Sequence, residues 1–304
     1  GDVKYGNSSS NDFNIRMAYV FSNKFAAKVT LSHLEGTEWH ATDYRNTANG
    51  GFTSGDRNSD RNYDGLNVYG DEVSTNMRGV AETLEGLGVI PGGASALIPS
   101  ENISRTGYDE RDLMTYEAKS VKFGGSLNYR PFGDDRFEVI WNSKVGVGNT
   151  IYQGTNRYNI NNFLLQQHKL ELKGKNFFVR GYVTSEDAGD SYDTRFAAIN
   201  INRAWKADNV WFGQYVGAYL QGTLGGLNSD QAHAVARQTA ETGRLVPGTP
   251  EFIAEFDKVT ADPDLITGSK FQDQTKLYHA NGNYNFQDHI DWAEFQVGGS
   301  YRRY

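Results

Sequence analysis

The densest cluster of residues that could bind a ligand is an acidic run at 56–72, which reads DRNSDRNYDGLNVYGDE. Its carboxylate and amide oxygens are the ligands that Ca²⁺ prefers. The run does not match an EF-hand loop, because Arg61 occupies the position of the obligatory glycine and Asn67 that of the bidentate glutamate. It therefore predicts either a structural Ca²⁺ site of another type or a solvated acidic turn. The carboxylates that would hold the ion are those of Asp56, Asp60, Asp64, Asp71 and Glu72.

Aromatic residues at 39–69 and at 205–215 form a second candidate set. Their rings could stack on a sugar or on a porphyrin-like ring of a ligand, or they could pack the interior of the segments that carry them. We retain both interpretations. The candidate ligand-binding residues are Trp39, Tyr44, Tyr63, Tyr69, Trp205, Trp211 and Tyr215.

The sequence predicts no covalent chemistry and no catalytic residue. The six histidines form no HExxH or HxH pair, no Gly-x-Ser-x-Gly elbow is present, and GLGVIPGG at 86–93 lacks the Lys-Ser/Thr of a phosphate-binding loop. The absence of cysteine excludes thiol nucleophiles, thiolate metal sites and disulfides within this sequence. A net charge of −7 argues against a nucleic-acid partner.

Eight segments alternate apolar and polar residues with a period of two, which predicts long β-strands. In the first, Phe13 and Ile15 share one face while Asn14 and Arg16 share the other. A mean hydropathy of −0.62 and the lack of a run of about 20 apolar residues exclude a helical membrane protein. The predicted strands are 13–21, 25–34, 120–130, 136–148, 163–173, 177–186, 276–286 and 291–303.

The connections between these strands alternate between short and long. The long ones are 35–119, 149–162 and 187–275, and the short turns are 22–24, 131–136, 173–176 and 287–290. Outer-membrane β-barrels combine short periplasmic turns with long extracellular loops, and they place aromatic girdles at the membrane interfaces. Aromatic residues flank the short turns here, among them Phe21, Phe25, Phe132 and Trp292. The alternative is a soluble sandwich or barrel with two insertions.

The predicted fold is therefore all-β, a section of a transmembrane antiparallel β-barrel with large extracellular loops, one of them partly helical. We expect Val29, Leu31, Val121, Phe123, Val139 and Trp141 to face lipid, and Lys28, Lys122 and Asn142 to face the lumen. The first strand would enter from outside and the eighth would leave toward outside, so we expect an internal section of a larger barrel. The start, GDVKYGNSSSNDF, has no apolar segment of a signal peptide.

The long connection 187–275 carries its own elements. We predict a further strand at 195–206, outside the membrane, and helices at 209–222, 228–244 and 247–259. Ser229 or Asp230 would cap the second helix, and Thr249 with Pro250 would begin the third. We expect this connection and 35–119, both rich in acidic residues, to pack together as an extracellular cap over the barrel mouth.

Several stretches resemble the barrel region of TonB-dependent outer-membrane receptors of the Bacteroidetes type. They are KVTLSHLEGTEWHATDY (28–44), NYDGLNVYGDEV (62–73), ISRTGYDERDLMTYEAKSVKFGGSLNYRP (103–131), GRLVPGTPEF (243–252) and FQVGGSYRRY (295–304). The resemblance covers nearly the whole chain. It implies a barrel of about 22 strands that encloses a plug, of which eight strands are roughly a third. The plug and the box that TonB grips have no counterpart in this sequence.

The resemblance also implies a function and partners. The function is energised import across the bacterial outer membrane: a scarce small ligand is caught at the extracellular mouth and passes through the gated barrel. The partners are outer-membrane lipid, the TonB complex acting through parts outside this sequence, and a surface lipoprotein. Two alternatives remain open at this point: a passive porin or barrel scaffold of a secretion or surface-assembly machine, and a soluble glycan-binding all-β module.

Overall fold

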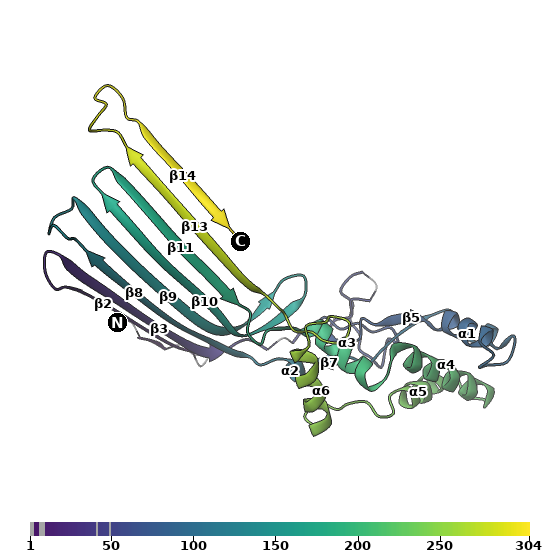
Figure 1. Cartoon of the computed structure of the whole chain (residues 1–304). Helices are drawn as coiled ribbons and strands as arrows, with labels where there is room; N and C mark the ends of the chain where they lie inside the picture. The colour runs from purple at the N-terminus through teal and green to yellow at the C-terminus, as the bar shows by residue number, and fades with distance from the viewer. Residues whose placement is uncertain (1–2, 6–9, 41, 49) are drawn as a thin grey trace.

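The structure is a computed structural model that describes residues 3–5, 10–40, 42–48 and 50–304. It consists of one large antiparallel sheet and a lobe of helices and short strands that projects beyond one end of the sheet (Figure 1). In the described part of the chain, no helix is long and apolar enough to cross a membrane.

Nine strands follow one another across the sheet, and each is antiparallel to its neighbours. The short β12 (Tyr192–Asp193) pairs with one of them, β10. In spatial order, the nine are β1 (Val3–Tyr5), β2 (Asn11–Val20), β3 (Phe25–Thr37), β8 (Glu117–Tyr129), β9 (Phe137–Gln153), β10 (Arg157–Gly174), β11 (Phe177–Asp187), β13 (Gln274–Asn285) and β14 (Gln296–Arg303).

The eight predicted strands are present, but the connection predicted at 149–162 is much shorter than expected. β9 continues to Gln153 and β10 begins at Arg157, so only a tight turn joins them. The pairing shifts register between Ile160 and Phe163, and Asn162 adopts a positive φ of 54°. A β-bulge of this kind inserts one residue and reverses the side-chain alternation. The period-two pattern of the strand predicted at 163–173 therefore does not continue back to Arg157, where β10 begins.

The ends of the sheet differ as predicted. The connections 38–116 and 188–273 leave from the end that also carries the tight turn between β9 and β10, and the turns at 21–24, 130–136 and 175–176 lie at the other end (Figure 1). The connection 286–295 lies there too, but it has ten residues and is longer than the turn predicted at 287–290, because β14 begins at Gln296 and not at 291. This arrangement follows from the strictly antiparallel order of the strands.

The lobe is built from both long connections. Its first part has β4 (Val68–Tyr69) paired with β7 (Tyr108–Asp109), and β5 (Ser74–Asn76) paired with β6 (Asn102–Ser104). The helices of this part are α1 (Met77–Gly86), η1 (Ala94–Leu97) and α2 (Glu110–Leu113). The second part contributes α3 (Thr194–Trp205), α4 (Asp208–Leu224), α5 (Ser229–Ala240) and α6 (Pro250–Ala261).

The strand predicted at 195–206 is wrong, because this segment is helix α3. Asp193 caps its N-terminus by accepting hydrogen bonds from the backbone N–H groups of Arg195 and Phe196. Ala197, Ala198 and Ile201 are buried at a spacing typical of a helix. The apolar residues of this segment also nearly alternate with polar ones, and this alternation led to the prediction of a strand.

The helices that were predicted as helices begin close to their predicted starts. α6 begins at Pro250 after the cap Thr249, as predicted. α5 lies within the predicted range 228–244, but the predicted caps Ser229 and Asp230 are wrong, because Asn228 is the N-cap and forms a capping box with Gln231.

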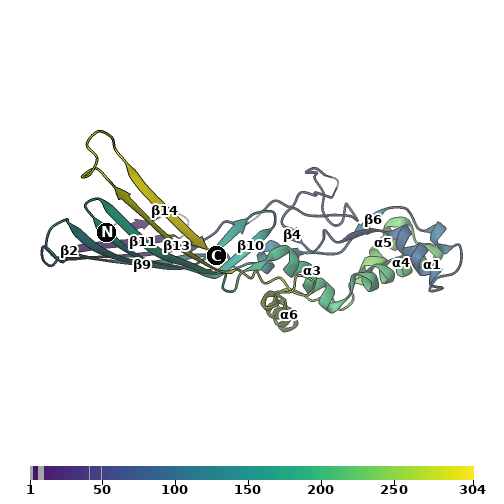
Figure 2. The same ribbon diagram turned by 45° about the horizontal axis from the view of Figure 1, so that its top comes forward.

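Two hydrophobic cores lie in the lobe. In the first, α1 packs against α4 and α5 through Met77, Ala81, Trp211 and Tyr215. The second joins α3 and α6 to the segment around β7. The two long connections therefore pack together, as predicted. Their lobe lies beyond the end of the sheet rather than over either of its faces (Figure 2).

The register divides the sheet into two chemically different faces. Val29, Leu31, Val121, Phe123, Val139 and Trp141 share one of them, here called the apolar face. Lys28, Ser126 and Asn142 form one row across three strands on the opposite side, here called the polar face, where Lys122 also lies. The predicted separation of the two sets is confirmed.

Candidate functional site

Neither face of the sheet carries a core of its own. Within the described residues, no hydrophobic side chain of the eight long strands is buried, whereas both hydrophobic clusters lie in the lobe. On the apolar face, the exposed fraction is 63% for Met17, 51% for Phe123 and 64% for Tyr301. A surface of this kind needs a cover of lipid or protein.

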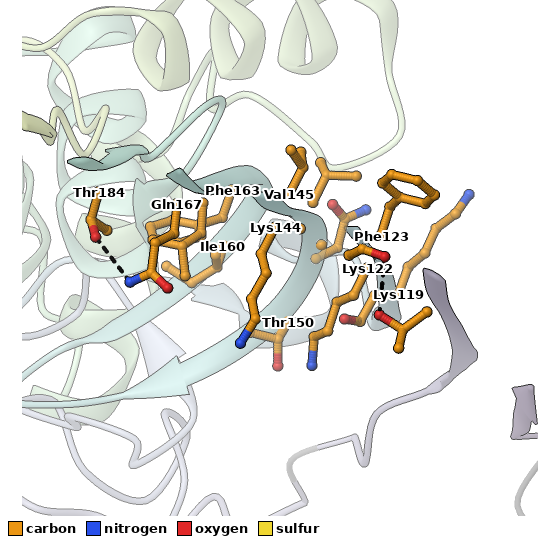
Figure 3. Close-up of a pocket in the computed structure, with 18 residues that line it drawn as sticks. Lys119, Lys122, Phe123, Lys144, Val145, Thr150, Ile160, Phe163, Gln167 and Thr184 are labelled. Carbon is orange, nitrogen blue, oxygen red and sulfur yellow. Dashed lines mark hydrogen bonds between the residues drawn. The ribbon is translucent and has the colours of Figure 1, made fainter. Parts of the chain in front are cut away.

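The polar face holds a pocket of about 480 Å³ at the level where the lobe begins (Figure 3). Its floor is formed by three glycines, Gly124 on β8 and Gly146 and Gly148 on β9. A Cβ atom at Gly124 would lie 2.6 Å from the Thr30 hydroxyl oxygen, and one at Gly148 would lie 2.6 Å from a backbone carbonyl oxygen. The hollow therefore depends on residues without side chains.

The β-bulge supplies one wall of the pocket. Ile160 pairs with Thr150 and Phe163 pairs with Gly148, so the extra residue turns both apolar side chains of β10 toward the polar face. Leu165 follows two residues later on the same face, opposite Gly146. The polar face is thus locally apolar beside the glycine floor.

Two lysines supply positive charge to the pocket. Lys122 pairs with Gly146 and Lys144 pairs with Gly124, so the two lysines are diagonal neighbours on adjacent strands. Neither forms an ion pair or a side-chain hydrogen bond with any described residue. Gln167, next to Lys144, donates from Nε2 to the Thr184 hydroxyl at 3.2 Å.

Three of the aromatic candidates are buried in the lobe. Trp211 and Tyr215 of α4 have exposed fractions of 1% and 0% and belong to the first hydrophobic core. Tyr63 is also buried, and its hydroxyl donates to the backbone carbonyl of Tyr44 at 2.6 Å. These three rings pack the interior of the lobe, where a ligand has no access.

The other four candidates have different surroundings. Tyr44 and Tyr69 donate their hydroxyls to carboxylates of the same long connection, those of Asp109 at 2.8 Å and Glu110 at 2.9 Å. Trp205 lies under a buried arginine side chain. Trp39, with 86% of its surface exposed, is a free ring near the end of the sheet.

Three of the proposed metal-binding carboxylates stabilise turns of the first connection. Asp56 accepts hydrogen bonds from backbone N–H groups of its own turn at 2.9 Å. Asp60 accepts from the side-chain amide of Asn46 at 2.6 Å, and Asp64 accepts from the Thr47 hydroxyl at 2.9 Å. Across the described ranges, no three His, Cys, Asp or Glu side chains converge on a metal-sized site.

The other two carboxylates are paired with arginines. Glu72 accepts from Nε of Arg195 at 2.9 Å, which links the two long connections. Asp71 is fully buried, with one oxygen 3.0 Å from the Gly65 N–H and 3.4 Å from the Arg57 guanidinium. Burial raises the pKa of Asp71 to about 8, and burial together with repulsion from other cations lowers the pKa of Arg57 to about 10.

A buried arginine ties the two connections together more tightly. Arg105, 1% exposed, donates to the Asp208 carboxylate at 2.6 Å and to the backbone carbonyls of Asn202 and Lys206 at 3.0 and 2.9 Å. Desolvation lowers the pKa of this guanidinium, and the contact with Asp208 opposes the shift. Arg105 therefore fixes the junction between α3 and α4 to the first connection.

A buried histidine forms a third link between the connections. His233 of α5 lies with Nδ1 2.9 Å from the Tyr215 hydroxyl and Nε2 2.6 Å from a carboxylate oxygen of Glu101. Burial, followed by the nearby Arg61 and Arg237, lowers the pKa of His233 to about 4. Burial also raises the pKa of Glu101.

Sequence reasoning placed the candidate site in the lobe and missed the pocket on the sheet. The available signal was the set of isolated glycines inside strongly alternating strands, at 124, 146 and 148, beside two lysines. No protein-family model and no curated protein matches the chain.

Proposed function

We propose that this chain is part of the barrel of a TonB-dependent receptor that imports a scarce nutrient across the bacterial outer membrane. The observation that carries the proposal is the uncovered apolar face, directly opposite a polar face, on strands that have no core of their own. A bilayer covers the first face with hydrocarbon and a water-filled lumen solvates the second.

The length of the apolar band supports a transmembrane sheet. On β8 the band runs from Val121 to Tyr129, which corresponds to about 27 Å along the strand at roughly 3.4 Å per residue. Barrel strands tilt by about 35–45°, and the hydrocarbon-facing band of such barrels is about 25 Å tall. At that tilt the band rises about 19–22 Å along the membrane normal, which is most of the height of such a hydrocarbon-facing band.

Aromatic side chains gather at the end of the sheet that carries the tight turns. The registers place Phe25 opposite Tyr129, and Phe177 opposite Tyr284, all on the apolar face. The rings of Phe137 and Phe177 lie 6.5 Å apart between neighbouring hairpins. Such a row at one level of a sheet fits an interfacial girdle.

The edges of the sheet support a larger assembly. Among the residues that the structure describes, β14 pairs only with β13, and β2 pairs with β1 over no more than Asn11 to Phe13. Free edges expose unpaired N–H and C=O groups, which a membrane protein satisfies by closing the sheet into a barrel. We therefore place this sheet within a barrel of about 22 strands.

Two observations support the proposal of a TonB-dependent receptor: the resemblance of five stretches of the sequence to that family, and the position of the lobe. The lobe lies at the end with the long connections, where a receptor would present its extracellular surface (Figure 1). In this proposal TonB and a plug act through other parts of the receptor, and a surface lipoprotein covers the mouth. No step of the import forms or breaks a covalent bond in the ligand.

Single cysteines test the lipid and lumen assignments, because this chain has none of its own. The variants Val139→Cys and Asn142→Cys would be made in the full-length protein and treated in intact outer membranes with a hydrophilic maleimide. We expect labelling at 142 and protection at 139. Equal labelling of both positions, or a product found in the soluble fraction, would exclude the barrel and favour the soluble glycan-binding module.

A second experiment separates active import from passive diffusion. Uptake of candidate nutrients would be compared in cells with and without a functional TonB protein. Uptake that persists at the same rate without TonB identifies a passive porin, and a protein with no uptake in either strain identifies a scaffold.

A further inference from the structure

The pocket on the polar face has no assigned ligand, and its composition is unusual for a solvated sheet surface. Lys122 and Lys144 extend to the same side of the sheet, and no acid among the described residues pairs with either (Figure 3). Diagonal neighbours on adjacent strands lie about 7–8 Å apart, close enough for the two ammonium groups to repel each other and to attract the same anion.

The acidic groups nearest to the pocket are already engaged. Glu38 accepts a hydrogen bond from the Thr150 hydroxyl at 2.9 Å, at the rim nearest the lobe. Glu186 of β11 lies in the row of Lys122, three strands away, and accepts from the Thr275 hydroxyl at 2.6 Å. Both carboxylates stay negatively charged, but among the described residues neither forms an ion pair with Lys122 or Lys144, so these two ammonium groups are left without a carboxylate partner.

The rest of the lining indicates what the anion is attached to. Ile160, Phe163 and Leu165 form an apolar wall beside the lysines, and the glycine floor allows a flat group to approach the backbone. The volume of about 480 Å³ lies within the usual range for small-molecule sites. A purely inorganic anion would leave this wall exposed to water.

We propose that the pocket binds a small organic acid, with its carboxylate between Lys122 and Lys144 and its apolar or ring body against Phe163. The hydroxyls of Thr30 and Thr184 and the amide of Gln167 complete the polar lining. This inference rests on the proposed function, because it names the class of ligand that a receptor would carry along its polar face.

The test uses the full-length protein in an uncharged detergent, with 2-naphthoate as the probe and 2-naphthamide as its neutral counterpart. Calorimetry should detect saturable binding of the naphthoate and binding at least about tenfold weaker for the amide, because the charge-assisted contacts are lost. Lys122→Gln and Lys144→Gln should each weaken naphthoate binding about tenfold, and Lys144→Arg should retain most of it.

Two further variants distinguish binding in the pocket from nonspecific attraction of an anion to the positive charge of the polar face. Lys28→Gln removes an unpaired lysine of the same face outside the pocket, and it should leave the affinity unchanged. Gly146→Val keeps every charge but places side-chain atoms on the floor, beside the Lys122 stem, and it should abolish binding. Each variant would first be checked for outer-membrane insertion and heat-modifiable migration on gels.

Several results would overturn the inference. They are the absence of saturable naphthoate binding, equal affinity for the amide, and an equal loss in Lys28→Gln. Absence of binding in a protein that inserts into the outer membrane and passes the cysteine-labelling test removes the organic-acid site and leaves the proposed function standing. Binding with this pattern in a protein outside the membrane would preserve the site and exclude the proposed function.

Discussion

The sheet and the lobe differ in where their apolar side chains lie: the lobe buries them within the chain, and the sheet exposes them. In the lobe, Trp211, Tyr215 and Ile201 are at most 1% exposed and contact other parts of the same chain. In the sheet, Trp141 and Tyr278 have nearly half of their surface exposed. Burial of apolar side chains within the chain therefore stabilises the lobe. The stability of the sheet depends on what covers its apolar face. Substitutions of similar chemistry should consequently have different effects in the two regions.

The largest difference is expected between two tryptophans. Trp211→Ala should destabilise the lobe by about 3–5 kcal/mol, because it leaves a cavity in the core and removes the ring that lies beneath Arg105 and Arg237. Trp141→Ala is the matched control, since it removes the same side chain from the apolar face. Hydrogen exchange of α4 amides should accelerate strongly in the first variant and stay unchanged in the second. Equal exchange in both would contradict the lobe as an independent folding unit.

The next effect should appear on the sheet and depend on lipid. Val139→Arg should destabilise the protein by about 2–4 kcal/mol if residue 139 lies near the bilayer midplane. Asn142→Arg, on the polar face of the same strand, should change the free energy of unfolding very little. Denaturant unfolding from lipid vesicles measures both. A penalty at 142 as large as that at 139 would reverse the assignment of the faces.

The sequence predicted the sheet far better than it predicted the site. Strands such as 120–130 alternate between two environments, and this period is visible without knowing what covers each face. α3 was mistaken for a strand, because Phe196, Ile199 and Ile201 share a near-alternating pattern and the capping role of Asp193 depends on local geometry.

The location of the site could not be predicted from residue types alone, because it is set by contacts between distant parts of the chain. Trp211 and Tyr215 have the composition of a ligand-binding set, yet their burial is decided by contacts with α1, more than 120 residues earlier in the chain. The pocket on the polar face depends on the pairing register of β8, β9 and β10 and on the bulge at Ile160. Neither feature can be read from a local pattern.

A pH-dependent effect should be confined to the lobe. The pKa of His233 is lowered to about 4 in the folded protein, from an ordinary value near 6.5. The folded state therefore binds fewer protons than the unfolded state between these values, and the contribution of His233 to stability is lost as the pH falls from about 6.5 to about 4. The loss from His233 alone should be at most about 3 kcal/mol, and the raised pKa of Glu101, which acts in the opposite direction, reduces it.

Fluorescence of the buried Trp211 during denaturant unfolding measures this pH dependence. His233→Gln, which can still hydrogen-bond Tyr215, should unfold with a flatter dependence on pH over the same interval. Labelling at position 142 in the membrane should be the same at both ends of the interval. An unchanged slope in the glutamine variant would assign the pH dependence to other groups, with the buried Asp71 as the first to examine.

The smallest predicted effect concerns the start of α5. The side-chain oxygen of Asn228 accepts a hydrogen bond from the Gln231 N–H at 3.0 Å, and the Gln231 side chain accepts one from the Asn228 N–H at 3.1 Å. Asn228→Ala removes one half of this capping box and should cost about 1 kcal/mol, whereas Asn228→Asp should cost much less because it keeps an acceptor at the same position. Because α5 packs on α4 through Ala232 and Ala236, the loss should reach the first core and speed exchange of α4 amides. No residue of α5 lines the Lys122 and Lys144 pocket, so naphthoate binding there should be unaffected. Weakened binding in Asn228→Ala would mean that the lobe and the sheet are energetically coupled and that the contrast between them is incomplete.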